Sequence, residues 1–270
     1  MQKIKEYVLE QKASLKEKLA NAQIKPYFAI VQVGNVEASN RYVRNKIKDC
    51  NEVGIKTELI KCPDDISEEG LHSIIDSFNN NKDVTAVMVQ FPLPKHLDEQ
   101  KVASWIDPKK DADGFTNNGI TNPATPQGIV TYLERNDYEF QNKNALVIGR
   151  SNIVGKPMAK LLLEKNCNVT VCHSKTSKTK LDWHICHADL IICATGRAGL
   201  ITKESFSTRC WNNIVIFDVG INFNSEGKLV GDCEPDLPVF WQSPVPGGCG
   251  LLTRLQLLEN IIKLYEVQND

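Results

Sequence analysis

Tyr42 and Lys46 stand four residues apart in a segment, 37–53, whose pattern predicts a helix that ends at Gly54. Residues at that spacing share one face of a helix. A tyrosine ring beside an amine can hold a flat ligand and exchange a proton with it. For Lys46 alone, a solvated surface lysine is the simpler interpretation, because lysine is abundant in this chain.

Two more polar side chains could face the same ligand. Gln90 ends an apolar run, 84–90, that predicts a buried strand, and open α/β sheets bind ligands where their parallel strands end. Asp113 lies in the acidic turn 111–115, where a carboxylate can grip the amidine-like edge of a heterocycle by paired hydrogen bonds. Taken alone, such a turn is more often only structural.

The segment 149–157 joins a predicted strand to a predicted helix and contains Gly149, Arg150, Ser151 and Gly155. A helix N-terminus presents unpaired N–H groups and the positive end of the helix dipole, so this turn suits a phosphate group. The string does not follow the Gly-x-Gly-x-x-Gly pattern, and an ordinary strand-to-helix turn is an equally good interpretation of it.

The next predicted strand, 168–172, distinguishes between two dinucleotides. Proteins that bind NAD carry a carboxylate near the end of this strand, where it accepts hydrogen bonds from the ribose 2′-OH. Here the strand is followed by His173, Ser174 and Lys175, with Arg150 on the facing turn. A hydroxyl among cations suits a 2′-phosphate, which favours NADP over NAD. The alternative is that these are solvated loop residues.

Two further strings have structural interpretations beside functional ones. Thr125 can N-cap a helix whose first residue is Pro126. The loop 244–250 begins with two prolines and continues with three glycines. Those glycines let the backbone approach a ligand closely, or merely make a tight turn.

Strand and helix patterns alternate in two series, separated by the segment 107–127, which is rich in Pro, Gly, Asn and Asp. Such alternation is typical of α/β domains with parallel sheets, and the second series resembles a dinucleotide-binding half. The expected strands are 28–33, 57–60, 84–90, 144–149, 168–172, 189–194 and 214–219. The expected helices are 1–22, 37–53, 67–78, 156–165 and 253–266.

The composition is that of an ordinary globular protein of 270 residues, with 41% hydrophobic and 24% charged residues. This length exceeds what one core usually serves, so we expect two domains. A formal net charge of -1 argues against a protein that binds nucleic acid by neutralising phosphates. No apolar run reaches the roughly 18 residues of a membrane span, so no membrane partner is expected.

The nine cysteines include no Cys-x-x-Cys pair, so the usual zinc and redox signatures are absent and no metal is expected. The nearest approach to a ligand cluster, His184, Cys186 and His187, is interpreted as ordinary core or surface residues. The first 22 residues lack the apolar segment of a signal peptide and the arginines of a transit peptide. We therefore expect a cytoplasmic protein whose thiols are free.

Together these strings resemble the bifunctional methylenetetrahydrofolate dehydrogenase/cyclohydrolase family over nearly the whole chain. The matching strings follow in the family's order, and five ordered matches are far more specific than any one of them. The first match is the helix signature from Val33-Gly34 to Gly54-Ile55. The five that follow it in order are the strings 89–94, 111–115 and 149–157, Asp218-Val-Gly-Ile-Asn222, and Pro244-Val-Pro-Gly-Gly248.

The resemblance implies a two-domain α/β fold: an N-terminal catalytic domain that binds folate, 1–122, and a Rossmann-like NADP-binding domain, 123–249. The C-terminal helix, 250–270, would return to the first domain. It also implies a homodimer, a folate cleft between the domains, and a place in one-carbon metabolism and purine biosynthesis. The expected reactions oxidise methylenetetrahydrofolate with NADP and hydrolyse the methenyl product to 10-formyltetrahydrofolate.

The resemblance also implies the roles of individual residues. Tyr42 would stack on the pterin, Lys46 would be the essential catalytic group, Gln90 would bond and orient Lys46, and Asp113 would hold the amino-pyrimidine edge. The remaining residues would line the two binding sites: Gly149, Arg150, Ser151, Ser174 and Ile221 for the cofactor, and Gly247 and Gly248 near the folate.

The chain departs from the family's pattern at a few positions. The short strand that usually precedes the first helix is missing, and Ala124 stands where the family commonly has Cys. Cys249, Leu251 and Leu252 replace the more usual Val, Pro and Met of the final loop. Loss of that proline is expected to loosen the loop and to change substrate affinity.

Three functional interpretations follow. The first is the bifunctional enzyme, in which hydride transfer needs mainly alignment and hydrolysis needs a proton acceptor, for which Lys46 is the hypothesis. The second is a dehydrogenase that lacks the hydrolytic step or prefers NAD. The third is a ligand-binding protein without catalysis on the same fold. The joint presence of Tyr42, Lys46, Gln90 and Asp113 argues against the third.

Overall fold

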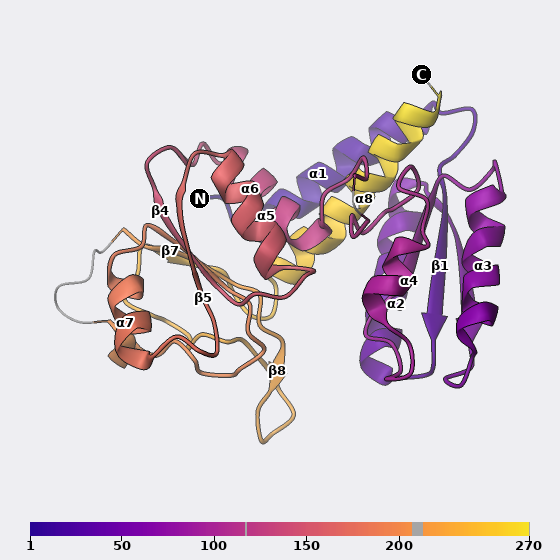
Figure 1. Cartoon of the computed structure of the whole chain (residues 1–270). Coiled ribbons are helices and arrows are strands. Elements are labelled where there is room, and N and C mark those ends of the chain that lie inside the picture. The colour runs from indigo at the N-terminus through magenta and orange to yellow at the C-terminus, as the bar shows by residue number, and fades with distance from the viewer. Residues whose placement is uncertain (117, 207–212, 270) are drawn as a thin grey trace. The chain divides into compact units, whose positions relative to one another are not determined.

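The computed structural model of the chain describes residues 1–116, 118–206 and 213–269 (Figure 1). These residues form two compact units, each built from two stretches of chain. One unit comprises Leu9–Ala124 and Arg254–Asp270, and the other comprises Met1–Val8 and Thr125–Thr253. Met1–Val8 thus groups with the second unit. The domain bounds 1–122 and 123–249 stay a prediction.

The unit that carries Lys46 contains a three-stranded parallel sheet with the strand order β2-β1-β3. Its strands are β1 (Tyr27–Val33), β2 (Lys56–Cys62) and β3 (Ala86–Gln90). The helices whose residues contribute to this unit are α1 (Ile4–Ala20), α2 (Glu37–Val53), α3 (Glu68–Asn80), α4 (Glu99–Ser104) and α8 (Cys249–Asn269).

Both faces of β1 and β3 are buried, as is expected where helices cover a parallel sheet on both sides, whereas β2 is only partly buried. Phe28 and Ile30 face one apolar cluster, which α2 and α8 complete. Ala29 and Val31 face the other cluster, to which α3 and α4 contribute. The alternation along β1 therefore fixes which side of the sheet each helix covers.

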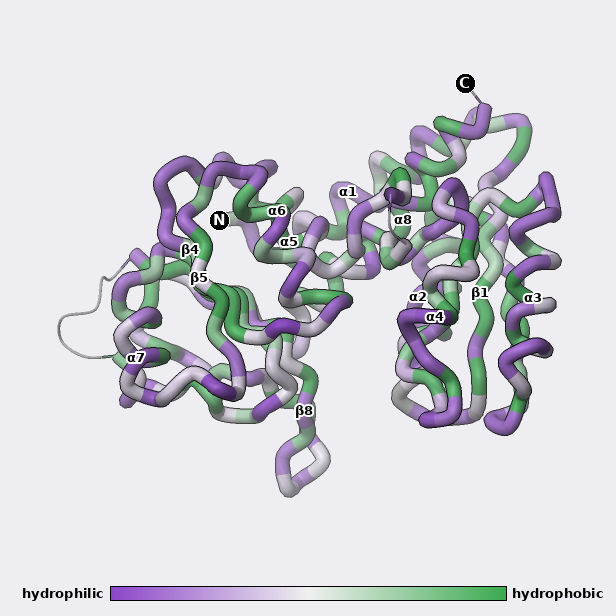
Figure 2. The backbone as a smooth tube through the Cα atoms, in the orientation of Figure 1, coloured by the Kyte–Doolittle hydropathy of each residue, from purple (hydrophilic) through white to green (hydrophobic). Residues whose placement is uncertain are grey.

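The second unit contains a five-stranded parallel sheet with the order β10-β7-β6-β4-β5. Figure 2 shows hydrophobic residues concentrated along its strands. The strands are β4 (Asn144–Ile148), β5 (Asn168–Cys172), β6 (Leu190–Cys193), β7 (Val215–Asp218) and β10 (Trp241–Gln242). The other elements are α5 (Ala124–Glu134), α6 (Gly155–Glu164), α7 (Lys178–Cys186), a 3-10 turn (Lys203–Ser205) and the β8 (Asn222–Phe223) and β9 (Leu229–Val230) hairpin.

Strand order in this sheet reverses at β4. After β4 the chain runs first to β5 on one side and then to β6 and β7 on the other. Ligands of open α/β sheets bind beyond the carboxyl ends of the strands at such a reversal. The fold therefore predicts a pocket where β4, β5 and β6 end.

Two local predictions from the sequence are wrong. Thr125 is the second residue of α5 and not its N-cap, and its hydroxyl lies 2.9 Å from the hydroxyl of Thr253. Cys186 is disulfide-bonded, so the thiols of this chain are not all free. Among the described residues, free thiols are carried by Cys50, Cys62, Cys167, Cys172, Cys193, Cys233 and Cys249.

The helices of the described residues include none with both the length and the apolarity that a bilayer crossing needs.

Candidate active site and cofactor pocket

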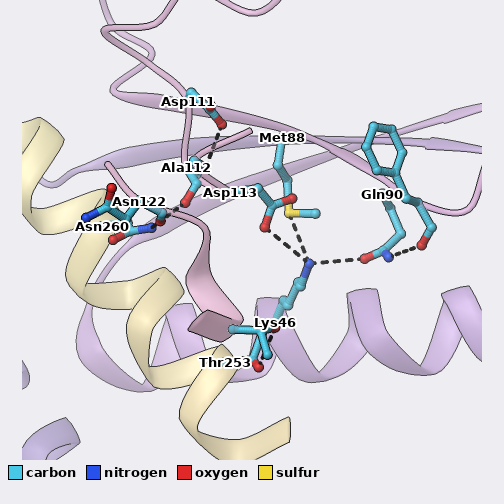
Figure 3. A network of polar contacts seen from close by, with 12 residues as sticks. Lys46, Met88, Gln90, Asp111, Ala112, Asp113, Asn122, Thr253 and Asn260 are labelled. Atoms are coloured by element: carbon cyan, nitrogen blue, oxygen red, sulfur yellow. Dashed lines mark hydrogen bonds and ion pairs between the residues drawn. The ribbon is translucent and has the colours of Figure 1, made fainter. Parts of the chain in front are cut away.

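The amine of Lys46 lies at the centre of a small polar cluster (Figure 3). Lys46 is only 8% exposed. Its Nζ donates hydrogen bonds to Oε1 of Gln90 at 3.2 Å and to Sδ of Met88 at 3.5 Å. Oδ1 of Asp113 lies 3.9 Å from the same nitrogen. Side chains from α2, β3 and the acidic turn thus converge on one cationic group.

The pleat of β3 explains this arrangement. Met88 and Gln90 are two residues apart, so they project from the same face of the strand, and Met88 packs in the apolar cluster that contains Val43 of α2. Nε2 of Gln90 donates to the carbonyl oxygen of Phe91 at 2.5 Å, which turns the amide oxygen toward Lys46. Gln90 therefore presents an acceptor to the amine in a fixed orientation.

Tyr42 lies one helical turn before Lys46 on α2. Its side chain is 36% exposed, so part of the ring is accessible to a ligand. Burial of the remainder raises the pKa of Tyr42, and the nearby Arg41 opposes this effect. The phenol is therefore neutral at physiological pH and offers an uncharged aromatic surface.

The acidic turn owes its shape to a buried carboxylate and a glycine. Asp111 is fully buried and accepts hydrogen bonds from the backbone N–H groups of Gly114 and Thr116, at 2.9 and 2.7 Å. Gly114 has a φ of 73°, and a Cβ atom there would lie 2.2 Å from the backbone carbonyl carbon of Asn122. A side chain at position 114 would therefore displace the turn that carries Asp113.

Asp113 is the carboxylate that this turn presents to Lys46. It is 9% exposed. Burial raises the pKa of Asp113, the charge of Lys46 lowers it, and the charge of Asp111 adds to the rise. A ligand that donates hydrogen bonds to this carboxylate would favour its ionised form.

Helix α8 supports the same turn from the other side. Nδ2 of Asn260, a residue only 3% exposed, donates to the carbonyl oxygens of Ala112 and Asn122 at 2.9 and 3.1 Å (Figure 3). These two carbonyls lie on the two ends of the loop that contains Asp113. Asn260 thus ties both ends of the loop to one helix, and the sequence alone did not indicate this role.

In the second unit, the ends of β4, β5 and β6 surround a pocket of about 290 Å³. This is the place that the strand order predicts. Four of the predicted cofactor residues line it: Gly149, Arg150, Ser151 and Ser174. The other lining residues are Ile148, Cys172, His173, Thr176, Leu181, Ala194, Thr195, Arg197 and Leu200.

Two glycines shape the first wall of this pocket. Gly149 has a φ of 127°, and a Cβ atom there would lie 2.2 Å from the carbonyl oxygen of Ala194. A Cβ atom on Gly155 would lie 2.4 Å from the carbonyl oxygen of Gly149. Oγ of Ser151 accepts hydrogen bonds from the N–H groups of Val154 and Gly155, at 3.2 and 3.3 Å, where α6 begins. Glycine at these two positions therefore lets the turn pack closely against Ala194 and against the start of α6.

The structure does not bring every predicted site residue to these two places. Ile221 is 50% exposed and is not among the residues that line the pocket. Gly247 and Gly248 lie in the loop before α8 and also do not line it. Gly247 has a φ of 101°, and a Cβ atom on Gly248 would lie 2.4 Å from the carbonyl oxygen of Pro244. Their role in binding folate stays a prediction.

The sequence interpretation missed one wall of the pocket, the turn 195–197, which contributes Thr195 and Arg197. The sequence nevertheless contains a signal that could have indicated this wall. The turn directly follows a predicted strand, 189–194, and contains Gly196, which has a φ of 67°. A glycine just after a buried parallel strand is typical of a ligand-binding turn.

Comparison with known proteins covers both units. The model of the tetrahydrofolate dehydrogenase/cyclohydrolase catalytic domain matches residues 1–113, and the model of that family's NAD(P)-binding domain matches residues 123–269. The bifunctional protein FolD of Brevibacillus brevis is 41% identical, with 94% of each chain covered.

Solved structures of methylenetetrahydrofolate dehydrogenase/cyclohydrolases are also similar to the structure of this chain. The bifunctional FolD dehydrogenase/cyclohydrolase of Campylobacter jejuni has a TM-score of 0.91 and 34% identity, with 98% of each chain covered. The Trypanosoma brucei enzyme, solved with NADP cofactor and inhibitor, has a TM-score of 0.89 and 26% identity over 97% of this chain and 95% of that one. The chain therefore belongs to the tetrahydrofolate dehydrogenase/cyclohydrolase family.

Proposed function

We propose that this chain oxidises 5,10-methylenetetrahydrofolate to the 5,10-methenyl form with NADP and then hydrolyses that product to 10-formyltetrahydrofolate. The observation that carries the proposal is the buried amine of Lys46, held by Gln90 and Asp113, in a chain that both family models match. Folate would bind to the domain 1–122 with 250–270, and the cofactor to the domain 123–249.

The pocket in the second unit fits NADP. Gly149 and Ser151 line the pocket beside the start of α6, where the N–H groups of a helix N-terminus attract a phosphate. Arg150 and Ser174 also line the pocket, and the described residues that line it include no Asp or Glu that would repel a 2′-phosphate. Bound there, the nicotinamide would supply the hydride acceptor. Ile221 is proposed to contact the same cofactor.

In the oxidation, the chain's own residues would align the folate. The accessible ring of Tyr42 would stack on the pterin, and Asp113 would accept hydrogen bonds from its amino-pyrimidine edge. Gly247 and Gly248 are proposed to lie near the folate. Little proton transfer is needed in this step, because the folate nitrogens stabilise the methenyl cation.

In the hydrolysis, the neutral amine form of Lys46 would accept a proton at Nζ from the water that attacks the methenyl carbon. The 3.2 Å contact with Gln90 fixes the direction of the amine. Little conformational entropy is therefore lost when the amine is oriented in the transition state. After ring opening, the same group can return the proton to the leaving nitrogen.

An absorbance assay tests this function. Methenyltetrahydrofolate should form from methylenetetrahydrofolate when NADP is supplied, and its absorbance should then decay as the hydrolysis proceeds. NAD in place of NADP should give a lower kcat/KM. If no methenyl product forms with either nucleotide, the proposal fails.

We also propose that the protein acts as a homodimer in the cytoplasm. The family resemblance supports the dimer, and the seven free thiols among the described residues support a reducing compartment. Light scattering of the purified protein checks the first point: a monomer mass of 30.2 kDa at assay concentrations would contradict it.

A further inference from the structure

Asp232 is fully buried just beyond β9, and its carboxylate accepts six hydrogen bonds, the longest from the thiol of Cys193 to Oδ2 at 3.8 Å. Oδ2 accepts from the N–H and the hydroxyl of Thr195, at 2.6 and 2.9 Å, and from the N–H of Gly196 at 3.1 Å. Oδ1 accepts from the N–H of Arg197 at 2.8 Å and from Nδ2 of Asn222 at 2.9 Å. Among the described residues no lysine or arginine pairs with it, so these donors alone compensate its burial.

Four of the six donors belong to one turn, 195–197. Three successive backbone N–H groups of this turn point at one carboxylate, which is the geometry of an anion nest. The positive φ of Gly196, 67°, lets the chain adopt that conformation. Thr195 and Arg197 also line the pocket, whereas Asp232 does not. The carboxylate thus holds one wall of the pocket from behind.

The backbone of Asp232 is itself held by a second buried carboxylate. Asp218, the last residue of β7, accepts from the N–H groups of Asp232 and Cys233, at 3.0 and 2.8 Å. A Cβ atom on Gly231 would lie 1.9 Å from Oδ2 of Asp218, so only glycine permits this approach. A continuous set of hydrogen bonds therefore runs from the sheet, through Asp232, to the turn 195–197.

We propose that Asp232 is a positioning residue for the dinucleotide: it contacts no cofactor atom and fixes the turn 195–197 in the conformation that NADP binding requires. This inference rests on the proposed function, because it takes the pocket to be the NADP site. An isosteric amide at position 232 would place an NH₂ group against N–H donors and would release part of the turn.

The test is Asp232→Asn, assayed for two properties that depend differently on the pocket. The Kd for NADP, measured by calorimetry, should rise about tenfold or more, which corresponds to about 1.4 kcal/mol. Hydrolysis of methenyltetrahydrofolate consumes no nucleotide, so its rate should stay within about twofold of that of the unmodified protein. An unchanged Kd, or an equal loss in both measurements, overturns the proposal.

Two controls keep the test decisive. Asn222→Ala removes a donor to Asp232 that lies outside the turn, so its Kd for NADP should change little. Thr195→Val removes only the hydroxyl donor and should weaken NADP binding to a smaller degree than Asp232→Asn does.

If thermal denaturation shows that Asp232→Asn does not fold, an unchanged Kd for NADP in Thr195→Val overturns the proposal. If the unmodified protein binds no NADP, the proposed function itself fails.

Discussion

Asn260 donates a hydrogen bond of 2.9 Å to the carbonyl oxygen of Ala112, although the two residues are 148 positions apart in the chain. The acceptor residue directly precedes Asp113, the carboxylate beside Lys46. The direction of that carboxylate therefore depends on a residue of α8 and not only on its own turn.

Asn260→Leu keeps most of the side-chain volume and removes both donors from the turn. The free energy of unfolding should fall by about 1–3 kcal/mol, because two buried carbonyls lose their partner. The KM for folate should rise in both reactions, while the Kd for NADP stays the same. Asn269→Leu, at an exposed position of the same helix, is the control. Unchanged folate KM values in Asn260→Leu would show that the turn holds Asp113 without α8.

Lys46→Met removes the amine and retains an apolar stem of similar length. Hydrolysis of methenyltetrahydrofolate should slow by roughly 10²–10⁴-fold, the usual contribution of a general acid–base group. The oxidation should be impaired less, since alignment dominates that step. The absorbance decay of purified methenyltetrahydrofolate measures the effect. Lys48→Met, an exposed lysine on the same helix, should hydrolyse normally; equal rates in the two variants would refute the assignment.

Arg150→Ala tests the choice of nucleotide. The exposed guanidinium lines the pocket, so its loss should raise the KM for NADP roughly tenfold or more and should change the KM for NAD much less. Steady-state rates with each nucleotide give the ratio. Lys160→Ala removes a cation from the exposed face of α6 and should leave that ratio intact. If the KM values for NADP and NAD rose equally, Arg150 would contact a part that the two nucleotides share and not the 2′-phosphate.

Asp113→Asn tests the cost of the buried carboxylate. Because burial raises the pKa of Asp113 above its value in the unfolded chain, the folded protein binds more protons between those two pKa values. Its free energy of unfolding therefore falls as the pH rises through that interval. Asp113→Asn lacks this loss, so the thermal midpoint of the variant should rise relative to that of the unmodified protein as the pH is raised above the ordinary pKa of an aspartate, about 4. A difference that does not vary with pH would contradict the shift.

Gly114→Ala and Gly227→Ala form a matched pair, because both glycines have a φ of 73°. No atom lies within 4 Å of the Cβ position at Gly227, so that variant should lose only the about 1–2 kcal/mol of a left-handed alanine. At Gly114 the new methyl would overlap the backbone of Asn122, and the loss should reach roughly 2–5 kcal/mol. Chemical denaturation measures both. If both variants lost the same free energy of unfolding, the loop around Asn122 would be able to move aside without cost.

The elements that the sequence predicted well are those whose cause is local. Gly54 ends α2 in a left-handed conformation, and the hydroxyl of Ser67 caps α3, as their residue types indicate. The short helix α4 was missed, although Asp98 caps it with two hydrogen bonds, because six residues carry too little periodicity. The β8–β9 hairpin was missed for the same reason, since each strand has two residues.

The parts of the site that the sequence did not indicate are those that depend on distant contacts. Lys46, Gln90 and Asp113 were named because each stands at a helix face, a strand end or a turn. Asn260 and Asp232 were not named, since a buried polar residue in a helix or beyond a strand has no local signal. Their importance is visible only from the backbone groups that they hold, which belong to residues 35 or more positions away.

The division of α8 between the two units has a consequence for the order of synthesis. Leu257, Leu258 and Ile261 complete the apolar cluster against Phe28 and α2, yet they are translated after the whole of residues 125–253. On the ribosome, the sheet of the unit that contains Lys46 therefore has one face incompletely covered while the dinucleotide-binding domain is made. The nascent chain should expose that face to chaperones for most of its elongation.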